Sequence, residues 1–224
     1  MGSKNKLKRF RENEIFSNVL QPSREEVLKG FANKGKWNDF FEKPNPIVLE
    51  LGCGKGEYTV SLAAKNPNKN HIGIDIKGAR FWAGARDALD AQLKNVCFLR
   101  TQIELINFVF DDHEVDEIWI TFPDPQIKYT RTKHRLTNID FLTKYQKIIK
   151  KGGFLYLKTD SEFMHGYTLG LLKGLNCDII EAHHDIYKNP HVPQEITAVQ
   201  TFYEKKYLKI EKPITYIKFC LDNL

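Results

Sequence analysis

The stretch Pro46-Ile-Val-Leu-Glu-Leu-Gly-Cys-Gly-Lys-Gly56 decides the fold of this chain. Its first six residues form a short apolar run that ends in glycines, which is the pattern of a buried strand. The glycines allow a tight turn and a close approach of the backbone to a ligand. Their spacing is GxGxG, which differs from the dinucleotide pattern GxGxxG, and the chain has no GxxxxGK(S/T) phosphate loop. The turn therefore favours a ligand that is not held by its phosphates.

Strand and helix patterns alternate from residue 46 onward. We predict strands at 46–51, 71–75, 96–99, 117–122 and 154–158, and helices at 57–65, 78–93, 137–150 and 161–175. Two late β-rich runs, 177–184 and 215–221, could close the sheet as an antiparallel edge. This order predicts an α/β fold with a mostly parallel central sheet, an antiparallel edge strand and helices on both faces. Ligands of such sheets bind beyond the carboxyl ends of the strands.

Two acidic residues accompany the glycine turn. Glu50 directly precedes it, and Asp75 ends the next predicted strand, where a carboxylate can accept both hydroxyls of a ribose. Carboxylates in this place would repel a phosphate but suit a cationic ligand. The stretch resembles the first motifs of Rossmann-like methyltransferases that use S-adenosylmethionine, a cofactor with an ammonium and a sulfonium group. The alternative is a glycine turn that only connects a strand to a helix.

A second set of candidate residues follows the fourth strand. Phe122-Pro-Asp-Pro125 holds Asp124 between two prolines, on a stiff backbone that faces the expected ligand. A basic run follows, and its position beside the site favours phosphate contacts over a solvated loop. The cationic residues of this run are Lys128, Arg131, Lys133, His134 and Arg135.

These motifs and others together resemble the bacterial tRNA (guanine-N7-)-methyltransferase family. The resemblance rests on Phe122-Pro-Asp-Pro125, the basic run with Leu136, Lys158-Thr-Asp160 and Thr201-Phe-Tyr-Glu204, with Asn5-Lys6-Leu7 and Gln21-Pro22 near the start. It spans nearly the whole chain, and the order and spacing of the motifs make it specific. It implies a Rossmann-like methyltransferase fold, S-adenosylmethionine as cofactor, and methylation of N7 of a guanosine in the variable loop of tRNA.

The resemblance also implies roles for individual residues. Cofactor contacts fall on Glu50, Gly52, Asp75, Gln102 and Asp124, and substrate contacts fall on Lys128, Asp160, Thr201, Phe202, Tyr203 and Glu204. The chain departs from the family at Gln126-Ile127, where Trp-Pro is usual, at Thr130-Arg131, where Arg-His is usual, and at Gln102, where the family has a carboxylate. An amide at position 102 can still accept a hydrogen bond from the adenine amino group, so we expect binding to survive.

The chemistry explains why a carboxylate is needed. Guanine N7 carries a lone pair and no proton, so its methylation requires no general base. The transfer moves positive charge onto the purine ring, and a nearby carboxylate stabilises that charge and accepts from the base. We predict Asp124 as the catalytic residue. Asp160 could contact the substrate or cap the following helix, and both alternatives stay open.

The composition limits the other possibilities. The 224 residues suit one domain, predicted at 26–224, behind a basic and flexible arm at 1–25, and the net charge of +6 favours a polyanionic partner such as tRNA. Four scattered cysteines, without a signal peptide or membrane span, predict a cytoplasmic protein with no metal site and no membrane partner. We expect no obligatory protein partner, and a monomer or homodimer. Two alternative functions are an amino-methyltransferase acting on adenine or cytosine, and a non-catalytic RNA-binding protein with a methyltransferase fold.

Overall fold

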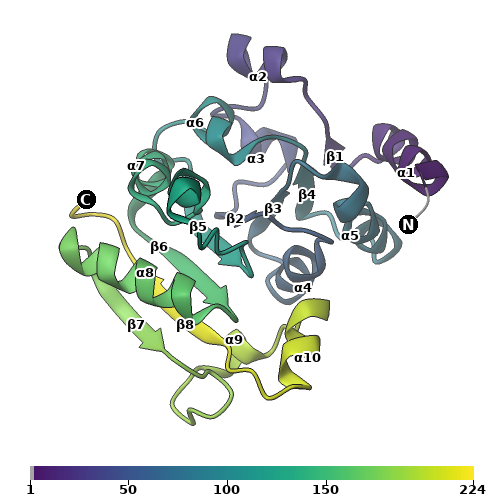
Figure 1. Cartoon of the computed structure of the whole chain (residues 1–224). Helices are drawn as coiled ribbons and strands as arrows, with labels where there is room; N and C mark the ends of the chain where they lie inside the picture. Colours follow the sequence, from purple (N-terminus) through teal and green to yellow (C-terminus); the bar gives the residue numbers. More distant parts are fainter. Residues whose placement is uncertain (1–2) are drawn as a thin grey trace.

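The computed structural model describes residues 3–224, which form an eight-stranded sheet with helices on both faces (Figure 1). The strand order is β1-β4-β3-β2-β5-β6-β8-β7. The strands are β1 Val19–Leu20, β2 Ile47–Leu51, β3 Asn70–Ile74, β4 Val96–Leu99, β5 Val115–Thr121, β6 Ile149–Thr159, β7 Ile179–His183 and β8 Thr215–Phe219. Neighbours pair in parallel except at β8, which is antiparallel to both β6 and β7. The predicted parallel sheet with an antiparallel edge is confirmed.

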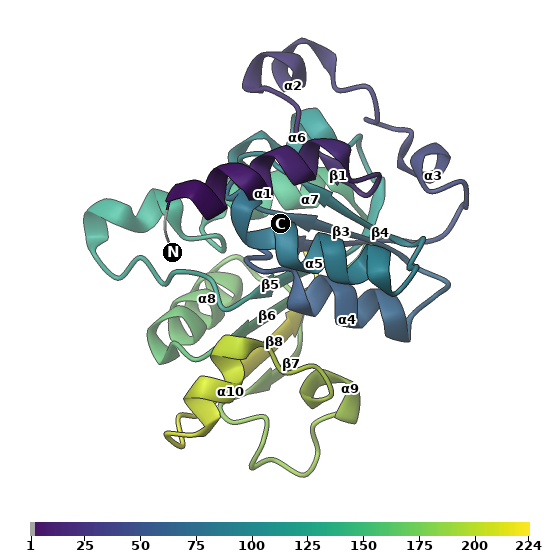
Figure 2. The ribbon, with the colours of Figure 1, turned by 90° about the vertical axis from the view of Figure 1, so that its right-hand side faces the viewer.

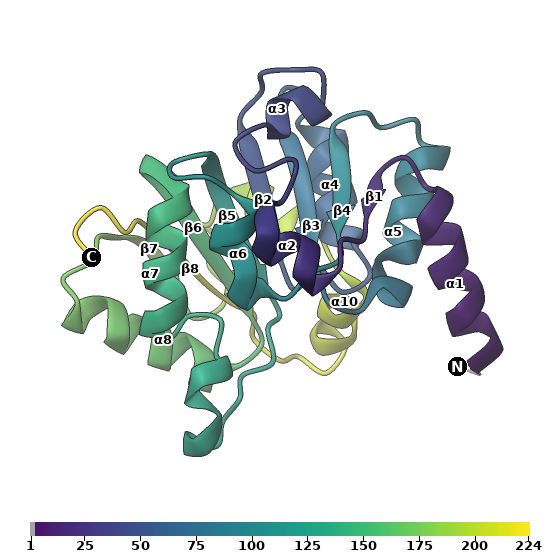
Figure 3. The same ribbon diagram turned by 90° about the horizontal axis from the view of Figure 1, so that it is seen from above.

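Helices cover the sheet in two layers. The α-helices are α1 Ser3–Ile15, α2 Arg24–Gly30, α3 Trp37–Phe40, α4 Glu57–Lys65, α5 Gly78–Asp90, α6 Ile106–Val109, α7 Ile139–Ile148, α8 Glu162–Gly174, α9 Gln194–Thr197 and α10 Phe202–Leu208. Two short 3-10 helices, η1 Ile103–Leu105 and η2 Tyr129–His134, complete the set. Helices α2, α3, α6 and α7 lie on one side of the central strands, and α4 and α5 lie on the other (Figures 1 and 3).

The core follows the alternation of side chains along the strands. In β2, Leu49 and Leu51 belong to the main apolar cluster with α2, α6 and α7, whereas Val48 points into a second cluster with Tyr58 and Trp119. All five residues of β2 are buried, as expected for a strand of a parallel sheet covered on both faces. The central position of β2 explains why its apolar run is the clearest signal in the sequence.

Strand β6 begins earlier than the sequence indicated. Helix α7 ends at Ile148, and the strand starts at Ile149, ahead of the glycines that we expected to separate helix from strand. The pairing with β5 jumps from Val115–Ile149 to Glu117–Phe154, and Gly152 has φ +74°. Gly152 and Gly153 therefore lie in an irregularity inside the strand, and Gly152 adopts the left-handed backbone that this irregularity needs.

The N-terminal segment also differs from the flexible arm that we expected at 1–25. From residue 3 onward it forms α1, which packs on α5, then β1, which pairs with β4, and the start of α2. The buried Asn13 side chain donates to the Gly78 carbonyl oxygen at 3.0 Å, and Arg9 stacks on Trp82 at 4.6 Å. These contacts connect residues 65 and 73 positions apart, and the local run of charge, which does not record them, suggested a flexible tail. Residues 1–2 lie outside the described part of the chain. None of the described helices has the length and apolar character that a bilayer span requires.

Candidate active site

The predicted site residues converge at one edge of the sheet because the parallel strands all end there. The chain leaves β2 at Gly52, β3 at Asp75 and β5 just before Asp124, and it leaves β6 at Asp160. The start of α1 and the loop around η2 extend beyond this edge, and α10 lies beside it (Figures 2 and 3). The topology therefore brings four distant stretches of sequence to one site.

The turn after β2 requires its glycines. Gly52, Gly54 and Gly56 have φ of +76°, +59° and +79°, a left-handed backbone that other residues rarely adopt. A Cβ on Gly56 would lie 2.5 Å from the Phe98 ring, so this glycine permits close packing of α4 on the sheet. Added Cβ atoms on Gly52 and Gly54 would have no neighbour closer than 3.8 Å. These two glycines leave open space above the turn, as a bound ligand would need.

Asp75 fixes this turn. One of its carboxylate oxygens accepts from the Gly54 amide at 3.0 Å, and the other accepts from the Lys77 amide at 2.8 Å. Each oxygen keeps a lone pair for a further donor. Asp75 forms no ion pair with any residue of the described chain. Its negative charge is therefore available to a ligand.

Glu50 lies below the turn and is buried. One oxygen accepts from the Thr59 amide at 2.8 Å and from the Thr59 hydroxyl, and the other accepts from the Thr121 hydroxyl at 2.5 Å. Burial raises the pKa of Glu50 to about 7, although these hydrogen bonds oppose the shift. Glu50 is thus anchored by the protein itself, with little surface left for a direct cofactor contact.

Asp124 is exposed on a strained loop. Phe122 and Gln126, two residues before and after it, both have φ +47°, which costs a non-glycine residue on the order of 1–2 kcal/mol. The Asp124 carboxylate accepts from the Gln126 amide at 3.2 Å and forms no ion pair with the side chains of residues 6–224. Strain of this kind concentrates at functional sites, because the surrounding structure must hold a side chain in place.

Gln102 follows β4 and faces the N-terminal segment. The Arg24 guanidinium donates to its side-chain oxygen, and both residues are exposed. They line a pocket of about 220 Å³ together with Ile76, which directly follows Asp75. The sequence offered no signal for Arg24, because it lies 78 residues away from its partner.

The basic run after Asp124 divides into two kinds of residue. Lys128, Arg131, Lys133 and His134 are exposed on or beside η2. Arg135 is buried, and its guanidinium donates to the carbonyl oxygens of Gln126 at 3.1 Å and Ile127 at 3.2 Å. The expected phosphate contact of Arg135 is therefore wrong, because its donors hold the Asp124 loop.

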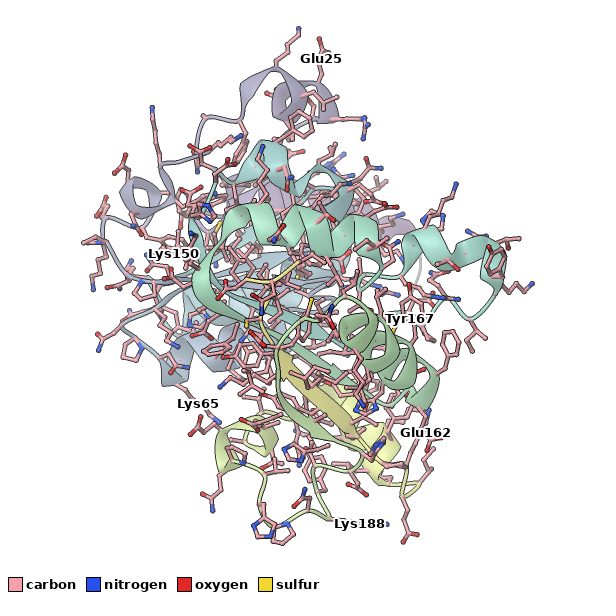
Figure 4. The ribbon with its side chains drawn as sticks, turned by 90° about the vertical axis from the view of Figure 1, so that its left-hand side faces the viewer. Glu25, Lys65, Lys150, Glu162, Tyr167 and Lys188 are labelled. Atoms are coloured by element: carbon pink, nitrogen blue, oxygen red, sulfur yellow. The ribbon has the colours of Figure 1, made fainter. Side chains whose placement is uncertain are left out.

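Arg135 also contacts α8, so that it links the Asp124 loop to this helix. The guanidinium lies 4.5 Å from the ring centre of Tyr167 and 4.9 Å from that of Phe163. Tyr167 projects from α8 on the side of the loop that carries η2 (Figure 4). Cation–π contacts with two rings hold the guanidinium plane and so fix the strained loop against a helix.

Asp160 does not cap α8. The cap is Ser161, whose hydroxyl accepts from the Met164 amide at 3.2 Å. The Asp160 carboxylate instead forms an ion pair with Lys212 at 2.5 Å, just ahead of β8. The capping alternative is thus wrong. Asp160 lies at the edge of the sheet as predicted from its position after β6, but its negative charge is already paired with Lys212.

The motif Thr201–Glu204 begins α10 and contains two kinds of side chain. Thr201 and Glu204 form a reciprocal capping box, and Glu204 is fully buried. Phe202 and Tyr203 are 53% and 46% exposed. The Phe202 amide donates to Glu57 at 2.9 Å, and Lys55 lies 3.9 Å from its ring centre. The motif therefore presents the aromatic side chains of Phe202 and Tyr203 beside the glycine turn, while Thr201 and Glu204 stabilise the start of α10.

Lys158 supplies that support from β6. Its fully buried ammonium donates to the carbonyl oxygens of Ile196 at 2.8 Å and Val199 at 3.1 Å, and it pairs with Glu204 at 2.7 Å. Burial lowers the pKa of Lys158, while the Glu204 carboxylate opposes that shift. Tyr187 donates a further hydrogen bond to Glu204 at 2.7 Å. Sequence reasoning noted Lys158 only as part of a motif, and nothing local signalled its burial.

The chain matches known methyltransferases over most of its length. Residues 44–217 match a family described as "Putative methyltransferase". The chain is 68% identical over 221 residues to the tRNA (guanine-N(7)-)-methyltransferase of Christiangramia forsetii, with 98% of this chain and 99% of that protein covered. It is 49% identical to the corresponding enzyme of Porphyromonas gingivalis, with 87% and 79% covered. The chain belongs to the tRNA (guanine-N(7)-)-methyltransferase family.

Solved methyltransferases share the fold of this family member. The 16S rRNA methyltransferase KamB superposes with a TM-score of 0.63 over 83% of this chain and 92% of that chain, at 12% identity. A structure of an antibiotic-related methyltransferase gives a TM-score of 0.60 over 91% and 96%, at 16% identity. At these identities the likeness shows the fold alone, and it confirms the predicted Rossmann-like methyltransferase architecture.

Proposed function

We propose that this chain transfers a methyl group from S-adenosylmethionine to N7 of a guanosine in tRNA, with the variable-loop guanosine as the target. One observation carries the proposal beyond family membership. Asp75 and Asp124, two carboxylates that pair with none of the described cationic side chains, stand at the edge where the open glycine turn and the exposed residues of η2 also lie. This arrangement suits a cationic methyl donor beside a polyanionic substrate.

The residues present fit the cofactor. When bound, it supplies an electrophilic methyl group on a sulfonium. The remaining lone pairs of Asp75 can accept the two ribose hydroxyls, and the open side of Gly52 and Gly54 leaves room for the amino-acid end. Gln102 stands beside Ile76, where it can hydrogen-bond the adenine. Glu50 lies beneath the turn and acts through its charge and through the threonines that it holds.

Asp124 is the proposed catalytic residue. Because guanine N7 carries no proton, the chain needs to position the base and to stabilise the positive charge that develops on it. An exposed carboxylate on a clamped loop serves both needs, since it can accept from the N1–H and the exocyclic amine of guanine. Phe202 and Tyr203 offer aromatic faces on which a base can stack, and Lys128 can contact a neighbouring phosphate.

The location follows from the same chemistry. All four cysteines are free and buried, which fits a reducing compartment. We therefore include a cytoplasmic location in the proposal. Residues 3–224 contain no cluster of three or more histidine, cysteine, aspartate or glutamate residues that could hold a metal ion.

The test is methyl transfer from labelled cofactor to unmodified tRNA, followed by mapping of the modified base. Asp124→Asn removes the charge and keeps the size, and we expect kcat to fall by about 10²-fold or more, as when other enzymes lose a group that stabilises transition-state charge. Asp140→Asn, a change at another exposed aspartate, is the matched control. Modification at any atom other than guanine N7, or full turnover of Asp124→Asn, would contradict the proposal.

A further inference from the structure

A large cleft lies beside the glycine turn and outside the carboxylate site. It has a volume of about 830 Å³, and α1, the start of α5, the end of β4 and Tyr203 of α10 line it. Six cationic side chains and only two carboxylates, Glu57 and Asp87, contribute to its walls. The six cations, which we call the α1–α5 basic surface, are Lys6, Arg9, Lys55, Lys77, Arg80 and Arg100.

Four of the six cations of this surface have no counterion among the described residues. Lys6, Lys77, Arg80 and Arg100 form no ion pair with any residue between 3 and 224. Some lysines elsewhere are neutralised, since Lys69, Lys150 and Lys212 each pair with a carboxylate. Like charges gathered without counterions repel one another, so the arrangement favours an anionic ligand.

One cation of this surface, Arg100, is held in place by its neighbours. Arg100 stacks on the Phe10 ring at 4.8 Å and donates to the Ile76 carbonyl oxygen at 3.3 Å. A Cβ on Gly78 would meet Arg100, Gln21 and Phe10 atoms at 3.1–3.2 Å, so α1 docks tightly against the start of α5. Arg100 therefore loses less side-chain entropy on binding a ligand than a free surface lysine does.

The cleft shares Gly54 and Ile76 with the proposed cofactor site, but Asp75 and Asp124 do not line it. Beyond those two shared residues, its six cations disfavour the ammonium and sulfonium groups of the cofactor. The exposed side chain of Tyr203, which we propose as a stacking platform for a base, forms part of the wall of the cleft. The start of α1 and the loop with η2 extend beyond the same edge of the sheet (Figure 2). A folded RNA lying across the glycine turn would therefore meet cations on both sides.

We propose that the α1–α5 basic surface binds the sugar–phosphate backbone of tRNA, as a second contact separate from the loop that carries η2. This inference rests on the proposed function and adds the N-terminal helix to the substrate site. The contact is electrostatic and independent of base identity, so it contributes affinity and orientation but no sequence specificity.

The test reverses one charge on each wall. Lys6→Glu/Arg80→Glu should weaken binding of unmodified tRNA by ~10-fold or more near 0.15 M salt and lower the slope of log K against log salt by ~0.7–0.9 for each phosphate that the variant no longer binds. The affinity for S-adenosylhomocysteine, measured by calorimetry, should not change. Lys94→Glu/Lys173→Glu is the matched control, because both lysines are exposed, form no ion pair in the described chain and alter the net charge equally.

The outcomes separate the two proposals. A salt slope and tRNA affinity equal to those of the control variant would overturn the basic surface and leave the methyl-transfer proposal intact. Wild-type protein that binds tRNA but transfers no methyl group to guanine would overturn the proposed function alone. A loss of tRNA binding in the Lys6/Arg80 variant only, with unchanged circular dichroism and melting temperature, supports the surface.

Discussion

Glu50 shows how a single residue can serve the site without facing it. Its carboxyl is buried under the glycine turn, and both oxygens accept from threonine donors of α4 and β5. The nearby negative charge of Asp75 adds to the effect of burial in raising the pKa of Glu50 to about 7. A cationic ligand above the turn would favour the charged form, so ligand binding and protonation of Glu50 are linked.

The pKa of Glu50 predicts how stability depends on pH. Between about pH 4.5 and 7 the folded protein keeps a proton that the unfolded chain has lost, so this residue's contribution to the free energy of unfolding falls as pH rises through that range. Glu50→Gln removes the titration, and its amide can accept from Thr59 through the oxygen and donate to the Thr121 hydroxyl through the nitrogen. We expect the stability of Glu50→Gln relative to wild type to increase from pH 5 to 8, measured by urea unfolding without cofactor.

The comparison with wild type is needed because other residues titrate in the opposite sense. Burial lowers the pKa of His71 to about 3 and that of His165 to about 4, so their contributions rise with pH up to the ordinary histidine value. Both histidines remain in the Glu50→Gln protein and cancel in the difference. Glu162→Gln, at an exposed glutamate, serves as the control, and identical pH profiles for all three proteins would contradict the prediction.

At the scale of elements, the segment 196–204 depends on one buried ion pair. The ammonium of Lys158, at the end of β6, donates to Ile196, Val199 and Glu204. These contacts hold the start of α10, and with it the exposed aromatic side chains, beside the glycine turn. A buried pair with every donor satisfied contributes more to position than to net stability. Lys158 and Glu204 are therefore positioning residues for Phe202 and Tyr203.

Breaking this pair should be costly. Lys158→Met leaves the Glu204 carboxylate buried without its counterion, and we expect a loss of ~3–5 kcal/mol of stability. Lys158→Met/Glu204→Gln removes both charges and should recover part of that loss, which a double-mutant cycle from denaturant unfolding would measure. Additive losses in the two single variants would show that the pair is not coupled.

The loop between β5 and α7 makes a second element-scale prediction. Lys128→Ala and Arg131→Ala should each reduce the salt dependence of tRNA binding by ~0.7–0.9 per phosphate released and leave the melting temperature unchanged, because both side chains are exposed. Arg135→Ala should lower the melting temperature, because it frees the Gln126 and Ile127 carbonyls and two aromatic rings. The opposite pattern, with Arg135→Ala stable and altered only in salt dependence, would show that this guanidinium faces the RNA.

At the scale of the whole molecule, the net charge of +6 is unevenly placed. Lys6, Lys55, Arg80 and Arg100 are far apart in the sequence, and only the docking of α1 on α5 and the shared edge of β2, β3 and β4 bring them together. The carboxylates of Asp75 and Asp124 follow β3 and β5 at the same edge of the sheet. Adjacent acidic and basic regions explain how one protein can take a cationic donor and a polyanionic acceptor at the same edge.

The sequence by itself determined the strand–turn–helix unit around Gly52, the parallel sheet and the family. Each of these depends on short-range patterns, namely apolar runs, glycines with left-handed backbone and the motifs at strand ends. It also placed Asp75 and Asp124 at one edge, because parallel strands share the same carboxyl end.

Only the tertiary structure decided which charged residues face a ligand. Arg135, Lys158 and Glu204 resemble surface charges in the sequence, yet all three are buried and hydrogen-bonded within the protein. The helix α1 resembles a basic tail, yet Asn13 and Phe10 dock it on α5. The physical reason is that the decisive contacts Arg135–Tyr167, Lys158–Glu204 and Asn13–Gly78 join residues 32, 46 and 65 positions apart. No local pattern of charge or hydrophobicity records such contacts.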